Sequence, residues 1–221
     1  MTLHVLVTGA NRGIGFEFCK QYLSLGCKVT AVVRKASAEL ESLGVDIIED
    51  IDVATENGAK KLLAALGSEK IDILINNAGV FHNETLAEMD FENIDHQFNV
   101  NALGPIRVTH ALLDNLKAGS KVAMITSRMG SIADNGSGGY IGYRMSKAAL
   151  NAASVSMAHE LKNQDIAVGL FHPGFVQTQM VGFAGDIGPD VAAERLIKRI
   201  EHLTIENSGG FWHSNGDTLP W

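Results

Sequence analysis

Short apolar runs recur along the chain and alternate with longer segments of helical pattern. Most of the runs are nearly continuously hydrophobic and rich in Val, Ile and Leu. A strand of this kind is typical of a parallel sheet whose two faces are both covered by helices. We predict strands over Leu3 to Thr8, Lys28 to Val33, Val45 to Asp50, Ile71 to Asn76, Lys121 to Ser127, Ile166 to His172 and Gly210 to His213.

The segments between these strands predict helices over Gly13 to Leu25, Thr55 to Leu66, Phe91 to Leu116, Ile141 to Asn163 and Pro189 to His202. Strand and helix therefore alternate, which predicts an α/β fold: a Rossmann-like, doubly wound parallel sheet of roughly six to seven strands with helices on both faces. With 221 residues, 46 % of them hydrophobic, and no linker, the chain suits a single domain over residues 1–221.

Two glycine-rich stretches, Asp134 to Gly142 and Gly182 to Gly188, are expected to be loops at the carboxyl ends of strands. Open α/β sheets bind their ligands at that edge.

The charge balance limits the classes of partner. A formal net charge of −7 argues against a surface that binds nucleic acid or an anionic membrane, because both need clustered cations. The first residues lack a basic leader, and no apolar run reaches the roughly 20 residues that span a bilayer. Cys19 and Cys27 are too few for a disulfide framework, and the histidines show no metal-ligand spacing. We expect a cytoplasmic protein without a metal.

A glycine-rich turn follows the first predicted strand and precedes a helix: Thr8-Gly9-Ala10-Asn11-Arg12-Gly13-Ile14-Gly15. Glycines let such a turn tighten and let backbone N–H groups approach a pyrophosphate, whose charge is favoured by the start of a helix. An ordinary strand-to-helix turn is the alternative, but the position after the first strand favours a nucleotide.

Tyr143 and Lys147 lie one turn apart at the start of a strongly helical stretch, so both are on the same face. Lowering the pKa of a phenol from about 10 to neutrality requires about 4 kcal/mol of differential stabilisation, which a neighbouring ammonium helps to supply. Tyr140 and Arg144 have the same spacing, and a simple contact on the helix surface is the other explanation for either pair.

Three motifs in order identify a resemblance to the short-chain dehydrogenase/reductase family. They are the T-G-x-x-x-G-x-G turn, Asn76-Asn77-Ala78-Gly79 after the fourth predicted strand, and the Y-x-x-x-K pair of Tyr143 and Lys147. The resemblance extends over essentially the whole chain. It implies that Tyr143 and Lys147 are catalytic and contact the cofactor, and that Asn77, Ala78 and Gly79 lie beside the cofactor.

The resemblance implies two further catalytic residues. Ser127, in Ile125-Thr126-Ser127-Arg128, would hydrogen-bond the substrate carbonyl, although its interval to Tyr143 is longer than usual in the family. Ser131 stands nearer the usual spacing and is the alternative, but Ser127 ends the predicted strand. Asn101 matches the position where a helix is bent and a water relays protons to the lysine, whereas Asn99 is expected to face away.

The cofactor is expected to be NADP(H). Where enzymes that prefer NAD place an acidic residue, this chain has Val33 followed by Arg34 and Lys35. Arg12 stands at the start of a helix, where an anionic partner such as a ribose 2′-phosphate would stabilise it. Solvated surface cations are the alternative explanation for Arg12 and Arg34.

The remaining cofactor contacts are implied by the resemblance. Asp52 and Val53 would contact the adenine. The segment after the sixth predicted strand would hold the nicotinamide carboxamide through Pro173, Gly174, Val176 and Thr178.

Within the family, the long interval between serine and tyrosine and the ending Leu219-Pro220-Trp221 most resemble the C-factor and sniffer-type carbonyl reductases. The expected function is hydride transfer between the nicotinamide cofactor and a small-molecule carbonyl or alcohol. The alternative is an NADP(H)-binding regulatory or signalling protein with little turnover. The short segment from Thr178 to Gly188 predicts an open site with broad tolerance for small or planar carbonyls.

Helices that are apolar on more than one face, with Ala148, Ala149, Ala152, Ala153 and Val155 as examples, favour a homodimer or homotetramer, as is usual in the family. A plain core role for these residues is the alternative.

Overall fold

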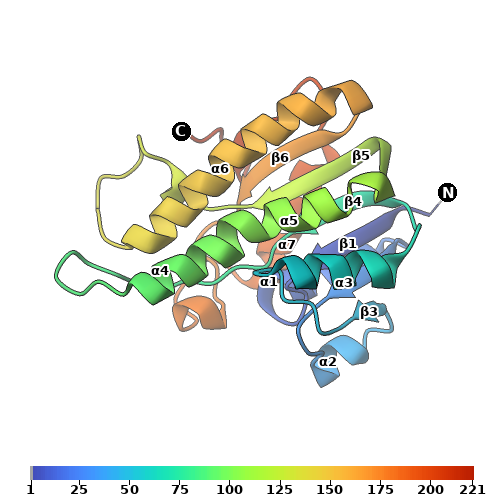
Figure 1. Ribbon diagram of the computed structural model, residues 1–221, viewed down its shortest axis with the longest axis horizontal. Coiled ribbons are helices and arrows are strands. Elements are labelled where there is room, and N and C mark those ends of the chain that lie inside the picture. The colour runs from blue at the N-terminus through green and yellow to red at the C-terminus, as the bar shows by residue number, and fades with distance from the viewer. Residues whose placement is uncertain (1) are drawn as a thin grey trace.

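The computed structural model describes residues 2–221 and contains one seven-stranded sheet in the order β3-β2-β1-β4-β5-β6-β7 (Figure 1). Every pair of neighbouring strands is parallel. The strands are β1 His4–Thr8, β2 Lys28–Val32, β3 Asp46–Ile48, β4 Ile71–Asn76, β5 Leu116–Ile125, β6 Ala167–His172 and β7 Phe211–His213. The predicted Rossmann-like α/β fold is confirmed.

The helices are α1 Gly13–Ser24, α2 Ala38–Glu41, α3 Glu56–Leu66, α4 Phe91–Phe98, α5 Gly104–Ala111, α6 Ile141–Leu161 and α7 Pro189–Glu201. The short α2 was not predicted. Its N-terminal cap is Ser37, whose side chain accepts a hydrogen bond from the Leu40 N–H. A single capped turn carries too little hydrophobic pattern to predict a helix from sequence.

The prediction of one continuous helix from Phe91 to Leu116 is wrong. A π-helical turn, Asn99–Leu103, separates α4 from α5, and the chain leaves α5 after Ala111 through a 3₁₀ turn, Leu113–Asn115. Pro105 is the second residue after the π turn, and a proline supplies no N–H to the preceding turn. A π turn inside a helix is frequent at functional sites, and this one contains Asn101.

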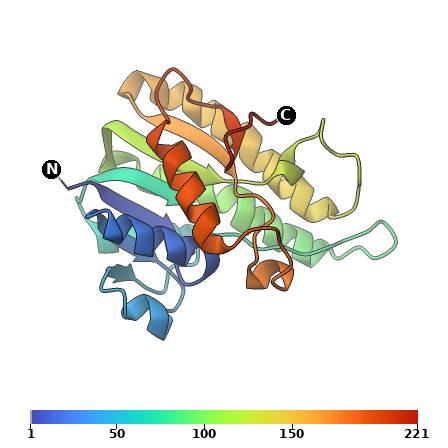
Figure 2. The same cartoon turned by 180° about the vertical axis from the view of Figure 1, so that it is seen from behind.

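Helices cover both faces of the sheet. In Figure 1 helices α3, α4, α5 and α6 lie over one face, and Figure 2, from behind, shows α1 and α7 over the other. The two layers have separate hydrophobic cores, so Leu6 of β1 belongs to one core, and Val5 and Val7 belong to the other. Burial on both faces explains why the strands read as continuous apolar runs.

Several boundaries differ from the predictions. β5 begins at Leu116, within the helix that we had predicted, and ends at Ile125, so Ser127 lies just beyond the strand. Helix α6 begins at Ile141, as predicted, so the predicted loop from Asp134 to Gly142 ends two residues earlier and Gly142 is helical. The alanines of α6 are not all core residues, since Ala152 is exposed and Ala149 is half-buried. Within residues 2–221, no helix combines the length and apolar character that crossing a membrane requires.

Candidate active site

The glycine turn between β1 and α1 has a backbone that requires glycine. Gly9 and Gly13 have φ values of 66° and 56°, in the left-handed region. A Cβ on Gly9 would lie 2.7 Å from the Cα of Ala78, and a Cβ on Gly15 would overlap the Gly9 carbonyl oxygen. The Asn77 amide donates to the carbonyl oxygens of Thr8 (3.0 Å) and Gly9 (3.2 Å). The turn and the segment after β4 therefore form one closely packed unit.

The start of α1 suits a bound anion. Arg12 occupies the cap position in extended conformation, no side chain caps the helix, and the first turn contains no acidic residue. The first N–H groups thus lack a side-chain acceptor at the positive end of the helix. Arg12 and Arg34 are exposed, and the Arg12 guanidinium donates to Gln179 Oε1 at 2.7 Å. The backbone N–H groups and the two exposed arginines together fit a dinucleotide phosphate.

Three other residues predicted to contact the cofactor make structural contacts. Asn11 Oδ1 accepts from the Ser37 N–H at 2.6 Å, which ties the glycine turn to the segment after β2. Asp52 is exposed at the end of its loop, and its carboxylate accepts from the Ala54 N–H at 3.0 Å. Val53 is buried, next to Gly104 at the start of α5.

The predicted catalytic residues Tyr143, Lys147 and Ser127 lie together at the carboxyl end of the sheet. Tyr143 and Lys147 are on the first turns of α6, and the lysine Nζ is 5.9 Å from the centroid of the tyrosine ring. The Ser127 side chain lies near the Tyr143 hydroxyl, close enough to act on its pKa. Lys147 Nζ donates to the Ile125 carbonyl oxygen at 2.9 Å, which holds it at the end of β5.

Burial shifts the pKa values of both members of the pair away from their ordinary values. Desolvation raises the pKa of Tyr143 to about 12. The neighbouring Ser127 side chain has a smaller, opposite effect and lowers this pKa. Desolvation also lowers the pKa of Lys147 to about 8. Both shifts favour the uncharged form, as expected for groups removed from water. The phenol of Tyr143 therefore carries its proton at neutral pH, as a proton donor to a substrate oxygen must.

Asn101 lies in the π turn and is fully buried. Its Oδ1 accepts from the Val80 N–H at 2.8 Å, and its Nδ2 donates to the Val80 carbonyl oxygen at 2.9 Å and to Ser146 Oγ at 3.0 Å. A Cβ on Gly79 would lie 3.3 Å from Asn101 Oδ1 and 3.9 Å from Lys147 Nζ, so Gly79 lies beside both side chains. Asn101 is thus next to the lysine.

The two alternative residues are engaged in other contacts. Ser131 is buried, and its hydroxyl oxygen accepts from the Asp134 N–H at 3.1 Å, where it stabilises the turn after β5. Asn99 Oδ1 accepts from Arg107 at 3.1 Å. The position of Ser127 near the Tyr143 hydroxyl and that of Asn101 near Lys147 favour these two residues as members of the site.

The segment after β6 reaches the glycine turn. Thr178 lies against Gly13, whose Cβ would be 3.3 Å from the threonine methyl group. Gly174 has a φ of 98° and faces His213, and Val176 forms a bridge with Ile187. The Pro173 carbonyl oxygen accepts from the Ser214 hydroxyl at 2.9 Å. The segment after β6 therefore lies beside the glycine turn.

Sequence analysis did not single out three residues around Tyr143. Phe81 packs edge-on against the Tyr143 ring, with centroids 4.8 Å apart, and Glu84 and Gln97 are buried polar residues close to the start of α6. They lie in a polar loop and on a short helix, where no spacing or motif distinguishes them from exposed residues.

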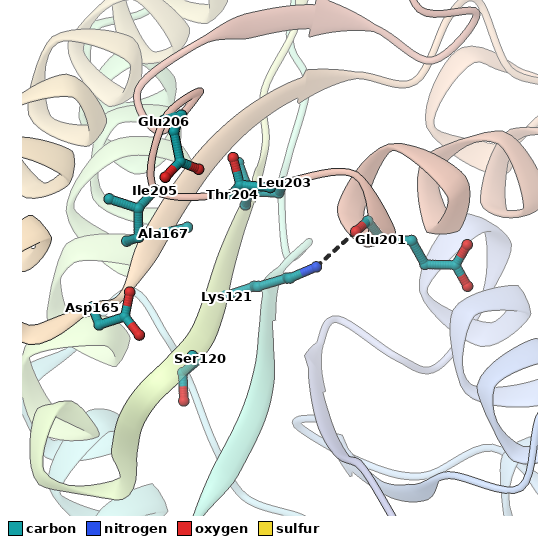
Figure 3. A pocket seen from close by; sticks show the side chains of 10 residues that line it. Ser120, Lys121, Asp165, Ala167, Glu201, Leu203, Thr204, Ile205 and Glu206 are labelled. Atoms are coloured by element: carbon teal, nitrogen blue, oxygen red, sulfur yellow. Dashed lines mark hydrogen bonds between the residues drawn. The ribbon is translucent and has the colours of Figure 1, made fainter.

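One hollow in the structure lies away from this site. It has a volume of about 450 Å³ and lies at the opposite end of the sheet, around the start of β6 (Figure 3). Lys121 lines it and donates to the carbonyl oxygens of Ile200 (3.0 Å) and Glu201 (2.8 Å), where it satisfies the end of α7. This lysine is therefore a structural cap.

Comparison with known proteins agrees with this geometry. A family model described as "short chain dehydrogenase" matches residues 3–186. A 1-hydroxy-2-glutathionyl-2-methyl-3-butene dehydrogenase from Rhodococcus sp. strain AD45 is 38 % identical over 98 % of this chain and 99 % of its own. The C-signal protein of Myxococcus xanthus is 43 % identical over 68 % of this chain and 93 % of its own, which bears out the resemblance to C-factor.

Among solved structures, a carbonyl reductase from Pseudomonas aeruginosa PAO1 in complex with NADP superimposes with a TM-score of 0.87 at 30 % identity, and each chain is covered completely. The parallel sheet and its helices are arranged as the family resemblance predicts. This chain therefore belongs to the short-chain dehydrogenase family of oxidoreductases.

Proposed function

We propose that the protein is an NADPH-dependent carbonyl reductase, which transfers hydride between the nicotinamide cofactor and a carbonyl or alcohol substrate. The observation that carries the proposal is the grouping of Tyr143, Ser127, Lys147 and Asn101 beside the glycine turn. The similarity to a carbonyl reductase in complex with NADP supports both the reaction and the cofactor.

When bound, the cofactor supplies the hydride, and this chain supplies the proton and the orientation. The Tyr143 hydroxyl donates its proton to the substrate oxygen as negative charge develops there. Ser127 hydrogen-bonds the same oxygen and lowers the cost of that charge. Lys147 would hold the ribose of the bound cofactor, and it stabilises the tyrosinate that results. Asn101 supports the path that returns a proton to the site.

The cation content of the turn supports NADPH over NADH. Arg34 and Lys35 follow the end of β2, where a carboxylate would repel a 2′-phosphate, and both are exposed. Arg12 shares the same end of the sheet. A planar guanidinium binds two oxygens of a phosphate through paired hydrogen bonds, which makes the two arginines the selective contacts.

The segment from Phe175 to Gly188 supports an open site for substrates with an apolar part. Phe175, Met180 and Phe183 are exposed by 50 %, 45 % and 68 %, so these side chains are free to cover a ligand rather than fill a core. The Rhodococcus relative acts, by its name, on a glutathione conjugate that carries a hydroxyl group. We include hydroxylated conjugates of this size in the substrate class, together with small and planar aldehydes, ketones and quinones.

The test is to titrate the protein with NADPH and with NADH and then to follow cofactor oxidation over a panel of these carbonyls. Tight binding of NADPH with turnover of a panel member, lost in Tyr143→Phe while NADPH binding remains, is the expected result. Undiminished turnover in Tyr143→Phe would refute the assignment. Tight binding without turnover across the panel would favour the regulatory alternative.

We also propose that copies of the chain pair through α4–α5 and α6 into a homodimer or homotetramer in the cytoplasm. The apolar surface of α6, which includes the exposed Ala152 and Met145, supports the pairing. Sedimentation in solution tests it, and a monomer at all concentrations would refute it.

A further inference from the structure

Glu84 is a buried carboxylate close to the candidate active site. It lies in the loop between β4 and α4 and is 2 % exposed. Within residues 2–221, none of the ion pairs includes it. A carboxylate removed from water without a cationic partner is costly unless hydrogen bonds or a helix start stabilise it. The neighbours of Glu84 supply hydrogen bonds and the start of helix α6.

The two groups that face the Glu84 carboxylate are both hydrogen-bond donors. Gln97 Nε2 donates to Oε1 at 2.6 Å, and the Gly142 N–H donates to Oε2 at 3.3 Å. The Gln97 amide is fully buried and cannot be reversed without loss, because its Oε1 accepts from the His82 N–H at 3.0 Å. A carboxylate accepts from both donors, whereas an amide at position 84 would place its own NH₂ group against one of them.

The same loop caps α6. Tyr140, at the cap position, is left-handed with a φ of 53°, and no side chain of its own segment caps the helix. The loop satisfies the consecutive N–H groups instead: Tyr140 donates to Asn83 Oδ1 (3.3 Å), Ile141 to the Glu84 carbonyl oxygen (3.4 Å), and Gly142 to the Glu84 carboxylate. The first turn of α6 is therefore held by a segment that is distant in sequence.

Close packing leaves this turn little freedom. A Cβ on Gly142 would lie 2.8 Å from Gln97 Nε2 and 3.0 Å from Glu84 Oε2, so glycine lets the network approach the helix. Phe81 packs edge-on against Tyr143 at 4.8 Å and stacks on Tyr140 at 5.2 Å. Figure 1 shows the loop before α4 and the start of α6 at the same end of the sheet.

We propose that Glu84, together with Gln97, is a positioning residue that fixes the first turn of α6 and so aligns the Tyr143 hydroxyl with Ser127. Glu84 touches the residue next to Tyr143 and acts through the backbone, without contact to the reacting atoms. The inference rests on the proposed function, because it deepens the assignment of Tyr143 as the proton donor.

Three variants separate this role from general effects on stability. In Glu84→Gln, the new amide NH₂ group faces one of the two existing donors, Gln97 Nε2 or the Gly142 N–H. The double variant Glu84→Gln with Gln97→Glu restores every hydrogen bond. The carboxylate at position 97 accepts from the His82 N–H and from the amide NH₂ group at position 84, and the amide oxygen at position 84 accepts from the Gly142 N–H. Glu88→Gln is the matched control, because Glu88 lies in the same loop and is exposed.

Two readouts are measured on the full chain. The kcat, the KM and the Kd for NADPH are measured with a carbonyl that the panel has identified. Fluorine NMR is recorded on protein labelled with fluorotyrosine, which gives one resonance for each of the 3 tyrosines. A Tyr143→Phe spectrum assigns the resonance of Tyr143, which therefore reports the environment of this ring even if no substrate is turned over.

We expect Glu84→Gln to lower kcat about 10- to 100-fold, as small misplacements of a catalytic group do, with NADPH Kd within about twofold. The Tyr143 resonance shifts in this variant, and both readouts return towards wild type in the double variant. Unchanged kcat and resonance in Glu84→Gln, or equal losses in the single and double variants, would overturn the inference. Absence of wild-type turnover with a Glu84-dependent Tyr143 resonance would instead refute the proposed function and leave the positioning intact.

Discussion

Replacement of Lys147 by methionine should stabilise the protein at neutral pH while removing its activity. The lysine is 4 % exposed, and burial lowers its pKa from 10.5 to about 8. Since one pKa unit corresponds to about 1.4 kcal/mol, holding the ammonium in this place lowers the free energy of unfolding by about 3 kcal/mol at neutral pH. The variant also loses the hydrogen bond to the Ile125 carbonyl oxygen, at a cost of about 1 kcal/mol.

The net expectation is a Lys147→Met variant more stable by about 2 kcal/mol near pH 7. The folded-state pKa lies below the unfolded value, so between about 8 and 10.5 the unfolded chain binds more protons and the stability of the wild type rises with pH. The advantage of the variant therefore shrinks through this window and is lost above it. Cys19, whose pKa burial raises to about 12, titrates in both proteins and cancels in the comparison.

The assay is urea unfolding followed by tryptophan fluorescence, repeated from neutral pH to about pH 10. Lys60→Met is the matched control, since Lys60 is an exposed helix residue whose replacement should change the stability little at any pH. The reasoning would be refuted if Lys147→Met were less stable than the wild type at neutral pH, or if the difference between them were the same across the pH range.

Three further predictions test the site. Gly15→Ala places a methyl group against the Gly9 carbonyl oxygen, so calorimetry should show NADPH affinity lower by about tenfold or more, and an unchanged Kd would contradict this. Arg34→Ala should weaken NADPH about 10- to 100-fold and leave NADH unaffected, as the loss of a charge-assisted hydrogen bond predicts; parallel losses for both would refute the contact. Ser127→Ala should lower kcat about 100-fold in steady-state assays and Ser131→Ala should change it little, whereas the reverse order would exchange their roles.

Hydrophobic pattern predicted the sheet because its strands are buried on both faces. The strand β4 was predicted with its observed bounds, Ile71–Asn76. Its successive residues Ile73, Leu74 and Ile75 face the two hydrophobic cores in turn, so the strand is apolar without a break. β5 is longer than predicted at its start, because residues such as Lys117 and Gly119 are exposed there and carry no apolar pattern. The π turn at Asn99–Leu103 depends on side-chain contacts with distant segments, and periodicity along one helix cannot reveal these.

The candidate site could be predicted where a motif carries its own chemistry. Tyr143 and Lys147 are one helical turn apart, so their sequence spacing already predicts their proximity. The contact between Ser127 and Tyr143 required the fold, because it joins the end of a strand to a helix across a loop. Glu84 could not be predicted to matter, since its burial arises only when α4 and α6 pack against its loop.

Transfer of deuterium from reduced NADP labelled at the hydride position is the most direct test of the proposed reaction. With an aldehyde or ketone that the panel identifies, we expect one deuterium on the carbinol carbon of the product, formed by the wild type and not by Tyr143→Phe, although that variant binds NADPH. Absence of the label from the carbinol carbon, or equal transfer by the wild type and Tyr143→Phe, would contradict the account.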